Sequence, residues 1–272
     1  MTDMEMKATK DLPFFRKKCE HLHDIAVSIG QSVKSCKSDD HLAFMGLCFL
    51  DKQIEHMESA LILVKAGQYR DASLIVRSMI EGLGQILHLR PAPQVLAKQW
   101  QDFGCVTSWR KMNMLTKAGQ PPGPETQKQI GAAARSVGQQ FYTEKAKKCL
   151  ATNKPLPADP YWKNWTNKNY SQLLRDANGG KLVDFVYGPF SEWHHWSPEG
   201  FNTSLKWENA NHINFLPPSI ILGAKTLACA FQCLFQQASL VDGYFHSRFD
   251  ALLAAIREDY IKHRPSGTKS ST

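Results

Sequence analysis

Apolar residues recur along most of this 272-residue chain at the spacing of an α-helix. Near the start of the chain the following residues fall on one helical face: Phe14, Phe15, Leu22, Ile25, Ile29 and Val33. An apolar stripe of this kind lets an amphipathic helix pack onto a core. Few segments alternate between apolar and polar residues as half-buried strands do. The pattern therefore predicts an all-α protein that forms a single-domain helical bundle.

Local start and stop signals divide this pattern into separate helices. Asp39 and Asp40 can cap a helix over 42–64, and Gly67 ends that helix. A third helix follows over 70–89, and Pro91 stops it because proline cannot continue the hydrogen-bond ladder. We expect the two helices to form an antiparallel hairpin. Further helices are predicted over 94–117, 126–150, 170–177, 181–195, 219–245 and 249–261.

Two stretches are expected to lack regular structure. Residues 153–167 combine three prolines with three large aromatic residues, so we expect a long irregular connection that the aromatic side chains hold in place. Residues 200–218 form the second irregular stretch. The helical bundle domain is predicted to span residues 1–263, and residues 264–272 are predicted to be a disordered tail.

The composition predicts a cytoplasmic protein. The chain is 43% hydrophobic, which is enough for a real core, and its charged first residues do not form a secretory signal. Lys225 and three glutamines interrupt the apolar run at 220–240, so we interpret this run as a core helix and expect no membrane partner. Seven irregularly spaced cysteines indicate reduced thiols, buried in the case of Cys48, Cys105, Cys229 and Cys233, and no disulfide framework.

A formal net charge of +8 permits an anionic partner such as RNA. The basic residues are scattered, with short runs only at 16–18 and 145–148, and no repeat of base-stacking aromatic residues accompanies them. Charge alone therefore leaves two interpretations open. The protein binds nucleic acid, or it has a basic surface that only keeps it soluble.

The third helix carries the first group of candidate site residues. Arg70, Arg77, Glu81 and His88 lie along one side of it, and apolar residues fill the opposite side. An ordinary solvated face with an i,i+4 Arg–Glu pair explains this pattern. Gly82 and Gly84 favour a special role, because glycine inside a helix costs roughly 1 kcal/mol unless another element or a ligand approaches closely.

The second group lies at 184–196. On a single helix Asp184, Tyr187, Ser191 and either His194 or His195 would share a face, although Pro189 forces a kink or starts a new helix. Histidine exchanges protons near neutral pH, so one imidazole is a candidate general acid or base. The alternative is that both histidines fill gaps between tryptophans.

A third polar cluster contains Asn211 and His212 on an irregular segment, and both are candidate substrate-binding residues. In principle His194, His195, His212 and Glu81 could bind zinc. No ligand pair has a recognised spacing, so we expect no metal and no cofactor.

The run from Ala72 to Glu81, Trp165 with Leu173 and Leu174, and Tyr187 with Ser191 and the histidine pair resemble a known family. It is the prokaryotic all-helical domain-of-unknown-function family 5677, and the resemblance extends over about 39–240. It implies a helical bundle in which Arg77, Glu81, Tyr187, Ser191 and His195 converge on one pocket, with no established substrate.

A looser similarity is to HEPN-type helical proteins, many of which are ribonucleases of toxin or phage-defence systems with an Arg-x(4–6)-His motif. Here Arg16 precedes His21 and His23 at allowed spacings, and Arg257 precedes His263. Neither match lies on the helix that carries the family resemblance, so the chain departs from the HEPN pattern.

Two functional hypotheses follow. In the first, the protein is a metal-independent nuclease, either toxin-like or a phage-defence effector, that acts on RNA or another phosphodiester. Arg77 would hold the phosphate, His195 would be the general acid or base, Glu81 would orient Arg77, and Tyr187 would help to position the substrate. An antitoxin or sensor protein is the expected partner.

In the second hypothesis the protein is a non-catalytic helical sensor or partner-binding protein, and the Arg–Glu pair is structural. The pair would staple helices around a ligand or a second subunit of a homo-oligomer. A buried Arg77–Glu81 pair packed on Tyr187 would favour this hypothesis.

Overall fold

The computed structural model describes residues 3–33, 35–37, 39–177, 179–194, 205–209, 212–216 and 219–263. Helices dominate these residues, so the predicted all-α class is confirmed. The contacts divide the chain into two compact units, which the hydrophobic pattern did not indicate. Unit 1 combines Met1–Arg90 with Tyr170–Thr272, and unit 2 is Pro91–Asn169. The predicted tail, 264–272, lies outside the described residues.

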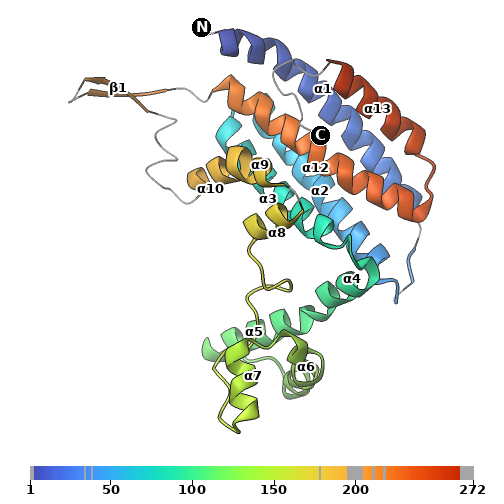
Figure 1. Cartoon of the computed structure of the whole chain (residues 1–272), viewed down its shortest axis with the longest axis vertical. Coiled ribbons are helices and arrows are strands. Elements are labelled where there is room, and N and C mark those ends of the chain that lie inside the picture. Colours follow the sequence, from blue (N-terminus) through green and yellow to red (C-terminus); the bar gives the residue numbers. More distant parts are fainter. Residues whose placement is uncertain are drawn as a thin grey trace. The chain divides into compact units, whose positions relative to one another are not determined.

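Long helices form the body of unit 1. They are α1 (Asp3–Ser32), α2 (His41–Lys65), α3 (Tyr69–His88), α12 (Ile220–Phe245) and α13 (Asp250–His263). Helix α12 packs against α1, α2 and α3, and α13 packs against α1 and α12 (Figure 1). Apolar residues recur around much of α12 because it has neighbours on several sides, and Leu227 and Leu234 are fully buried there. The predicted bundle is thus confirmed.

The start of α2 is fixed by Asp40, as the capping pattern predicts. The Oδ1 atom of Asp40 accepts a hydrogen bond from the amide of Ala43 at 3.1 Å. The hydroxyl of Tyr244, near the end of α12, donates to the same carboxylate at 2.8 Å. Gly67 then turns the chain from α2 into α3 with a left-handed φ of 75°. The short α2–α3 connection that the sequence predicts is confirmed.

Short helical segments cover part of α3. They are α8 (Tyr170–Asp176), α9 (Gly180–Leu182), the π-helical turn η2 (Val183–Tyr187) and α10 (Gly188–His194). Both α8 and α10 contact α3. The helix expected over 181–195 is observed as one helical run over 180–194, in which the π-helical turn η2 lies between α9 and α10. Pro189 lies just after this turn, and the backbone of the preceding Gly188 stays helical, so the irregularity at the proline is a π-helical turn within one helical run and not a separate new helix.

A β-hairpin forms within 200–218, which we expected to be irregular. Strand β1 (Leu205–Asn209) pairs antiparallel with β2 (His212–Phe215). The register shifts between Trp207 and Asn209. Such an irregularity disturbs the period-two alternation that would have indicated a strand in the sequence.

Unit 2 contains shorter helices than the pattern predicts. They are α4 (Pro93–Asp102), α5 (Gly104–Lys117), α6 (Pro124–Ser136), the 3-10 turn η1 (Gly138–Phe141) and α7 (Glu144–Ala151). The expected helix over 94–117 is therefore wrong as one element, because the chain turns at Phe103, whose ring packs edge-on against Phe141 at 5.1 Å. The expected helix over 126–150 is also divided, and Thr143 caps a new helix there.

The proline-rich connection at 153–167 is irregular and held in place, as predicted. Tyr161 packs edge-on against Trp109 with 5.2 Å between ring centroids. The guanidinium of Arg110 binds the carboxylate of Asp159 and donates to the backbone oxygen of Trp162 at 2.7 Å. Aromatic packing and one arginine thus replace regular backbone hydrogen bonding in this part of unit 2.

Within the parts of the chain that are described, no helix is long and apolar enough to cross a membrane.

All seven cysteines are free. Cys233 is buried as expected, whereas Cys48 is exposed and Cys105 and Cys229 are partly exposed. Burial raises the pKa of the Cys233 thiol well above its ordinary value.

Candidate functional site

The polar side of α3 is covered by protein instead of facing solvent. Helices α8 and α10 lie against α3, and only 17% of the Arg77 side chain and 19% of the Glu81 side chain are exposed. An ordinary solvent-exposed helix face would leave both side chains largely in water. The solvated-face interpretation is therefore wrong for these two residues.

Arg77, Glu81 and Tyr187 form a closed network, which we call the Arg–Glu–Tyr network. The Nη2 atom of Arg77 lies 3.0 Å from Oε1 of Glu81, one helical turn further along α3. The hydroxyl of Tyr187 donates to the same Oε1 atom at 2.9 Å and accepts from Nη2 of Arg77 at 3.3 Å. The guanidinium carbon also lies 5.2 Å from the centre of the tyrosine ring. The network connects α3 to the end of η2.

The local geometry of η2 explains how Tyr187 reaches the carboxylate. A π-helical turn adds a residue per turn and rotates the side chains that follow it. In η2 this leaves Asp184 exposed, where it pairs with Arg175 at 2.6 Å, while Tyr187 is buried. The face that we expected Asp184 and Tyr187 to share is therefore not formed.

Burial and the Glu81 carboxylate set the protonation of the phenol. Removal from water raises the pKa of Tyr187, and the negative charge of Glu81 raises it further. Tyr187 therefore stays protonated at neutral pH and donates its hydrogen bond. The Nε atom of Arg77 is buried and has no hydrogen-bond partner among the described residues, which costs about 1–3 kcal/mol unless another group reaches it.

Tyr170 is a further residue of this site, and the sequence analysis missed it. It begins α8, is partly buried, and its pKa is raised first by burial and then by the Glu81 carboxylate. Tyr170 is the first residue of the helix predicted over 170–177, and no sequence motif there connects it to Glu81. Only the packing of α8 on α3 brings the two residues together.

Other helices account for Gly82 and Gly84. A Cβ atom at Gly84 would lie 3.2 Å from Cγ of Leu174 on α8. A Cβ atom at Gly82 would lie 2.9 Å from Nε2 of Gln53 on α2. Close helix packing explains both glycines, and a bound ligand is not needed to explain either of them.

The remaining predicted site residues are not joined to the network by the described contacts. Ser191 is partly exposed, one turn after Tyr187 on α10. His194 ends α10, but its side chain lies outside the described residues, as do His195 and Asn211. His212 is exposed at the first position of β2. The described residues contain no cluster of three or more potential metal ligands.

A second polar contact of α3 connects it to α2. The Nε2 atom of His56 lies 3.1 Å from the hydroxyl oxygen of Ser78. The pKa of His56 is lowered, mainly by burial and also by the charge of Lys52, whereas Glu55 opposes the shift. The folded protein therefore favours the neutral imidazole.

We predict that His56 makes the protein sensitive to acid. The unfolded chain takes up the proton near its ordinary pKa of about 6.5, before the folded protein does, so the free energy of unfolding falls as the pH drops below that value. His56→Gln should make the fall in melting temperature between pH 7 and pH 5 shallower. The exposed His21→Gln is the control and should leave the profile unchanged. Identical profiles for wild type and His56→Gln would contradict the prediction.

Comparisons with known proteins identify the family. No curated protein and no solved structure matches the chain. A family model matches residues 43–213, which include α3, η2, α10 and the whole of unit 2. The resemblance seen in the sequence is thereby confirmed, whereas the looser HEPN-like resemblance is not. The match covers more than half of the chain, and the protein therefore belongs to the family of unknown function DUF5677.

Proposed function

We propose that this protein is a non-catalytic helical binding protein, and that the Arg–Glu–Tyr network is a clasp that holds the segment 170–194 on α3. The observation that carries the proposal is that one carboxylate oxygen, on Glu81, receives both Arg77 and Tyr187. The Nη2 atom of Arg77 is thereby engaged by both Glu81 and Tyr187, which favours a structural role for the pair. In this proposal the Arg–Glu–Tyr network fixes the surface that α8 and α10 present to a partner.

The clasp predicts a local effect of Tyr187→Phe. Loss of the hydroxyl removes two hydrogen bonds and leaves the ring in place, so the segment 170–194 should open more often while the rest of unit 1 stays closed. Hydrogen exchange measured by mass spectrometry should show faster exchange in 170–194 and unchanged exchange in α1. Unchanged exchange in 170–194 would show that the network is not a clasp.

Nuclease action is the second candidate. It is favoured by the partial exposure of Arg77 beside a protonated Tyr187, and by the histidine pair that begins at the last residue of α10. In this proposal Arg77 holds the phosphate, His195 is the general acid or base, and Glu81 orients Arg77. An antitoxin or sensor protein would then be the expected partner.

One assay separates the two candidates. The purified full chain is incubated with RNA in the presence of a chelator, and His195→Ala serves as the comparison. Cleavage by the wild type that disappears in His195→Ala would establish the nuclease and overturn the binding proposal. RNA that stays intact, with no growth inhibition on expression, supports the binding protein.

A further inference from the structure

Unit 2 carries the entire net charge of the protein. Between Pro91 and Asn169 there are twelve lysines and arginines but only four acidic residues, Asp102, Glu125, Glu144 and Asp159. The excess of eight positive charges equals the formal net charge of the whole chain. Unit 1 is therefore electrically balanced. The basic residues occur in both units, but the excess of positive over negative charge lies in unit 2.

The acidic residues of unit 2 are mostly neutralised within it. Asp102 pairs with Lys98 at 2.6 Å, Asp159 with Arg110 at 2.8 Å, and Glu144 with Lys147 at 2.8 Å. Eight further basic residues are exposed and form no ion pair within the described part of the chain. These residues are Lys111, Lys117, Lys128, Arg135, Lys145, Lys148, Lys154 and Lys163. Their charges remain available to an external anion.

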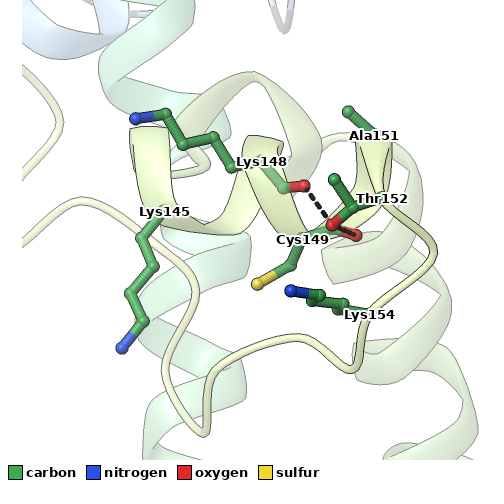
Figure 2. A pocket seen from close by; sticks show the side chains of 6 residues that line it. All are labelled: Lys145, Lys148, Cys149, Ala151, Thr152 and Lys154. Atoms are coloured by element: carbon green, nitrogen blue, oxygen red, sulfur yellow. Dashed lines mark hydrogen bonds between the residues drawn. The ribbon is translucent and has the colours of Figure 1, made fainter.

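Three of these lysines surround a hollow at the end of α7. The hollow has a volume of about 540 Å³ and is lined by Lys145, Lys148 and Lys154 together with Cys149, Ala151 and Thr152 (Figure 2). Helix α7 ends at Ala151, and Asn153, two residues later, adopts a left-handed conformation with a φ of 51°. The amide of Lys154 then donates to the backbone oxygen of Cys149 at 2.8 Å, which folds the chain back against the helix end. The three exposed lysines thus extend in different directions from one short, folded-back segment (Figure 2).

The aromatic residues of unit 2 are not arranged to recognise bases by stacking. Phe103 packs on Phe141, Phe141 on Trp162, and Trp109 on Tyr161, so these rings pack against one another inside the unit. Rings packed in this way do not form a platform on which bases stack. Any nucleic acid would be held through its phosphates, with strong salt dependence and little sequence preference.

We propose that unit 2 binds the phosphodiester backbone of nucleic acid, and that Lys145, Lys148 and Lys154 around the hollow contact its phosphates. This proposal rests on the proposed binding function and assigns nucleic acid as the partner of unit 2. A spread of unpaired cations over one unit suits a long polyanion, because each phosphate contact releases a condensed counterion. RNA and DNA share this chemistry, and the experiment distinguishes them.

The test uses fluorescence anisotropy of the full chain with a labelled 20-nucleotide RNA and with single-stranded and duplex DNA, at about 50–200 mM salt. The triple variant Lys145→Gln, Lys148→Gln, Lys154→Gln should bind at least roughly tenfold more weakly at the lowest salt. The slope of log Kd against log salt concentration should fall by about 2–3, close to one per lost phosphate contact. Circular dichroism should show unchanged folding, because all three side chains are exposed.

The matched control removes three exposed lysines from unit 1, as Lys10→Gln, Lys37→Gln, Lys52→Gln. Its net charge equals that of the first triple variant, so binding within about twofold of the wild type would locate the site in unit 2. Equal weakening by both triples, or no binding of RNA or DNA by the wild type, would overturn the proposal. Leu150 and Leu156 are exposed near the hollow, and binding only to vesicles containing anionic lipid would also overturn it.

The two proposals fail in different ways. Unchanged hydrogen exchange of 170–194 in Tyr187→Phe would remove the clasp but would not affect nucleic-acid binding by unit 2. Cleavage of bound RNA would replace the binding function by the nuclease and would leave the basic unit as its docking surface. Absence of nucleic-acid binding would leave the clasp intact with a different partner.

Discussion

Phe231→Ala is expected to lower the free energy of unfolding by about 3–5 kcal/mol, the cost of emptying the space of a buried aromatic ring. Phe231 is 1% exposed on α12, and its ring stacks on that of Tyr260 of α13 at 4.1 Å with an angle of 3° between them. Since domains are stable by only about 5–15 kcal/mol, a loss of this size is a large share of the total. Urea unfolding followed by circular dichroism measures it.

Leu252→Ala is the control for this prediction. Leu252 lies on α13 but is 50% exposed, so its truncation creates no internal cavity and should cost less than about 1 kcal/mol. If Phe231→Ala costs no more than Leu252→Ala, then α13 does not pack on α12 as the structure describes.

The second large effect is expected for Glu81→Ala. This change leaves the Arg77 guanidinium and the Tyr187 hydroxyl without their common acceptor in a site that is about four-fifths buried. We expect a loss of about 2–3 kcal/mol, below the cost of breaking a fully buried ion pair, because water still reaches part of the site. Glu81→Gln keeps an oxygen acceptor and should lose less. Thermal and urea unfolding of the purified variants measure the difference.

An exposed i,i+4 pair on α1 provides the matched control. Arg16 and Glu20 have the same i,i+4 spacing, and Nε of Arg16 lies 3.7 Å from Oε1 of Glu20. About half of each side chain is exposed, so Glu20→Ala should cost only about 0.3–0.5 kcal/mol.

In a double-mutant cycle, Glu81→Ala and Tyr187→Phe should be coupled by about 0.5–2 kcal/mol. Additive effects, or a Glu81→Ala loss equal to that of Glu20→Ala, would show that the network contributes nothing to stability.

The sequence predicted most residues of the candidate site, but it did not predict how they are arranged. The i,i+4 spacing joins Arg77 to Glu81 on any helix, and the family resemblance pointed to Tyr187. The π-helical turn that ends at Tyr187 has no sequence signal of its own, and it separates Asp184 from the face that Asp184 and Tyr187 were expected to share. Tyr170 approaches Glu81 only because two segments distant in sequence pack together.

The sequence by itself determined the helical class, the core helices of unit 1 and the cap at Asp40, because periodicity and capping are local properties. The tertiary structure decided where long helical patterns break in unit 2, since Phe103 turns inward to reach Phe141. It also decided which polar face is covered and which compact unit holds the excess positive charge. Burial and clustering depend on contacts between distant segments, and no window of the sequence contains them.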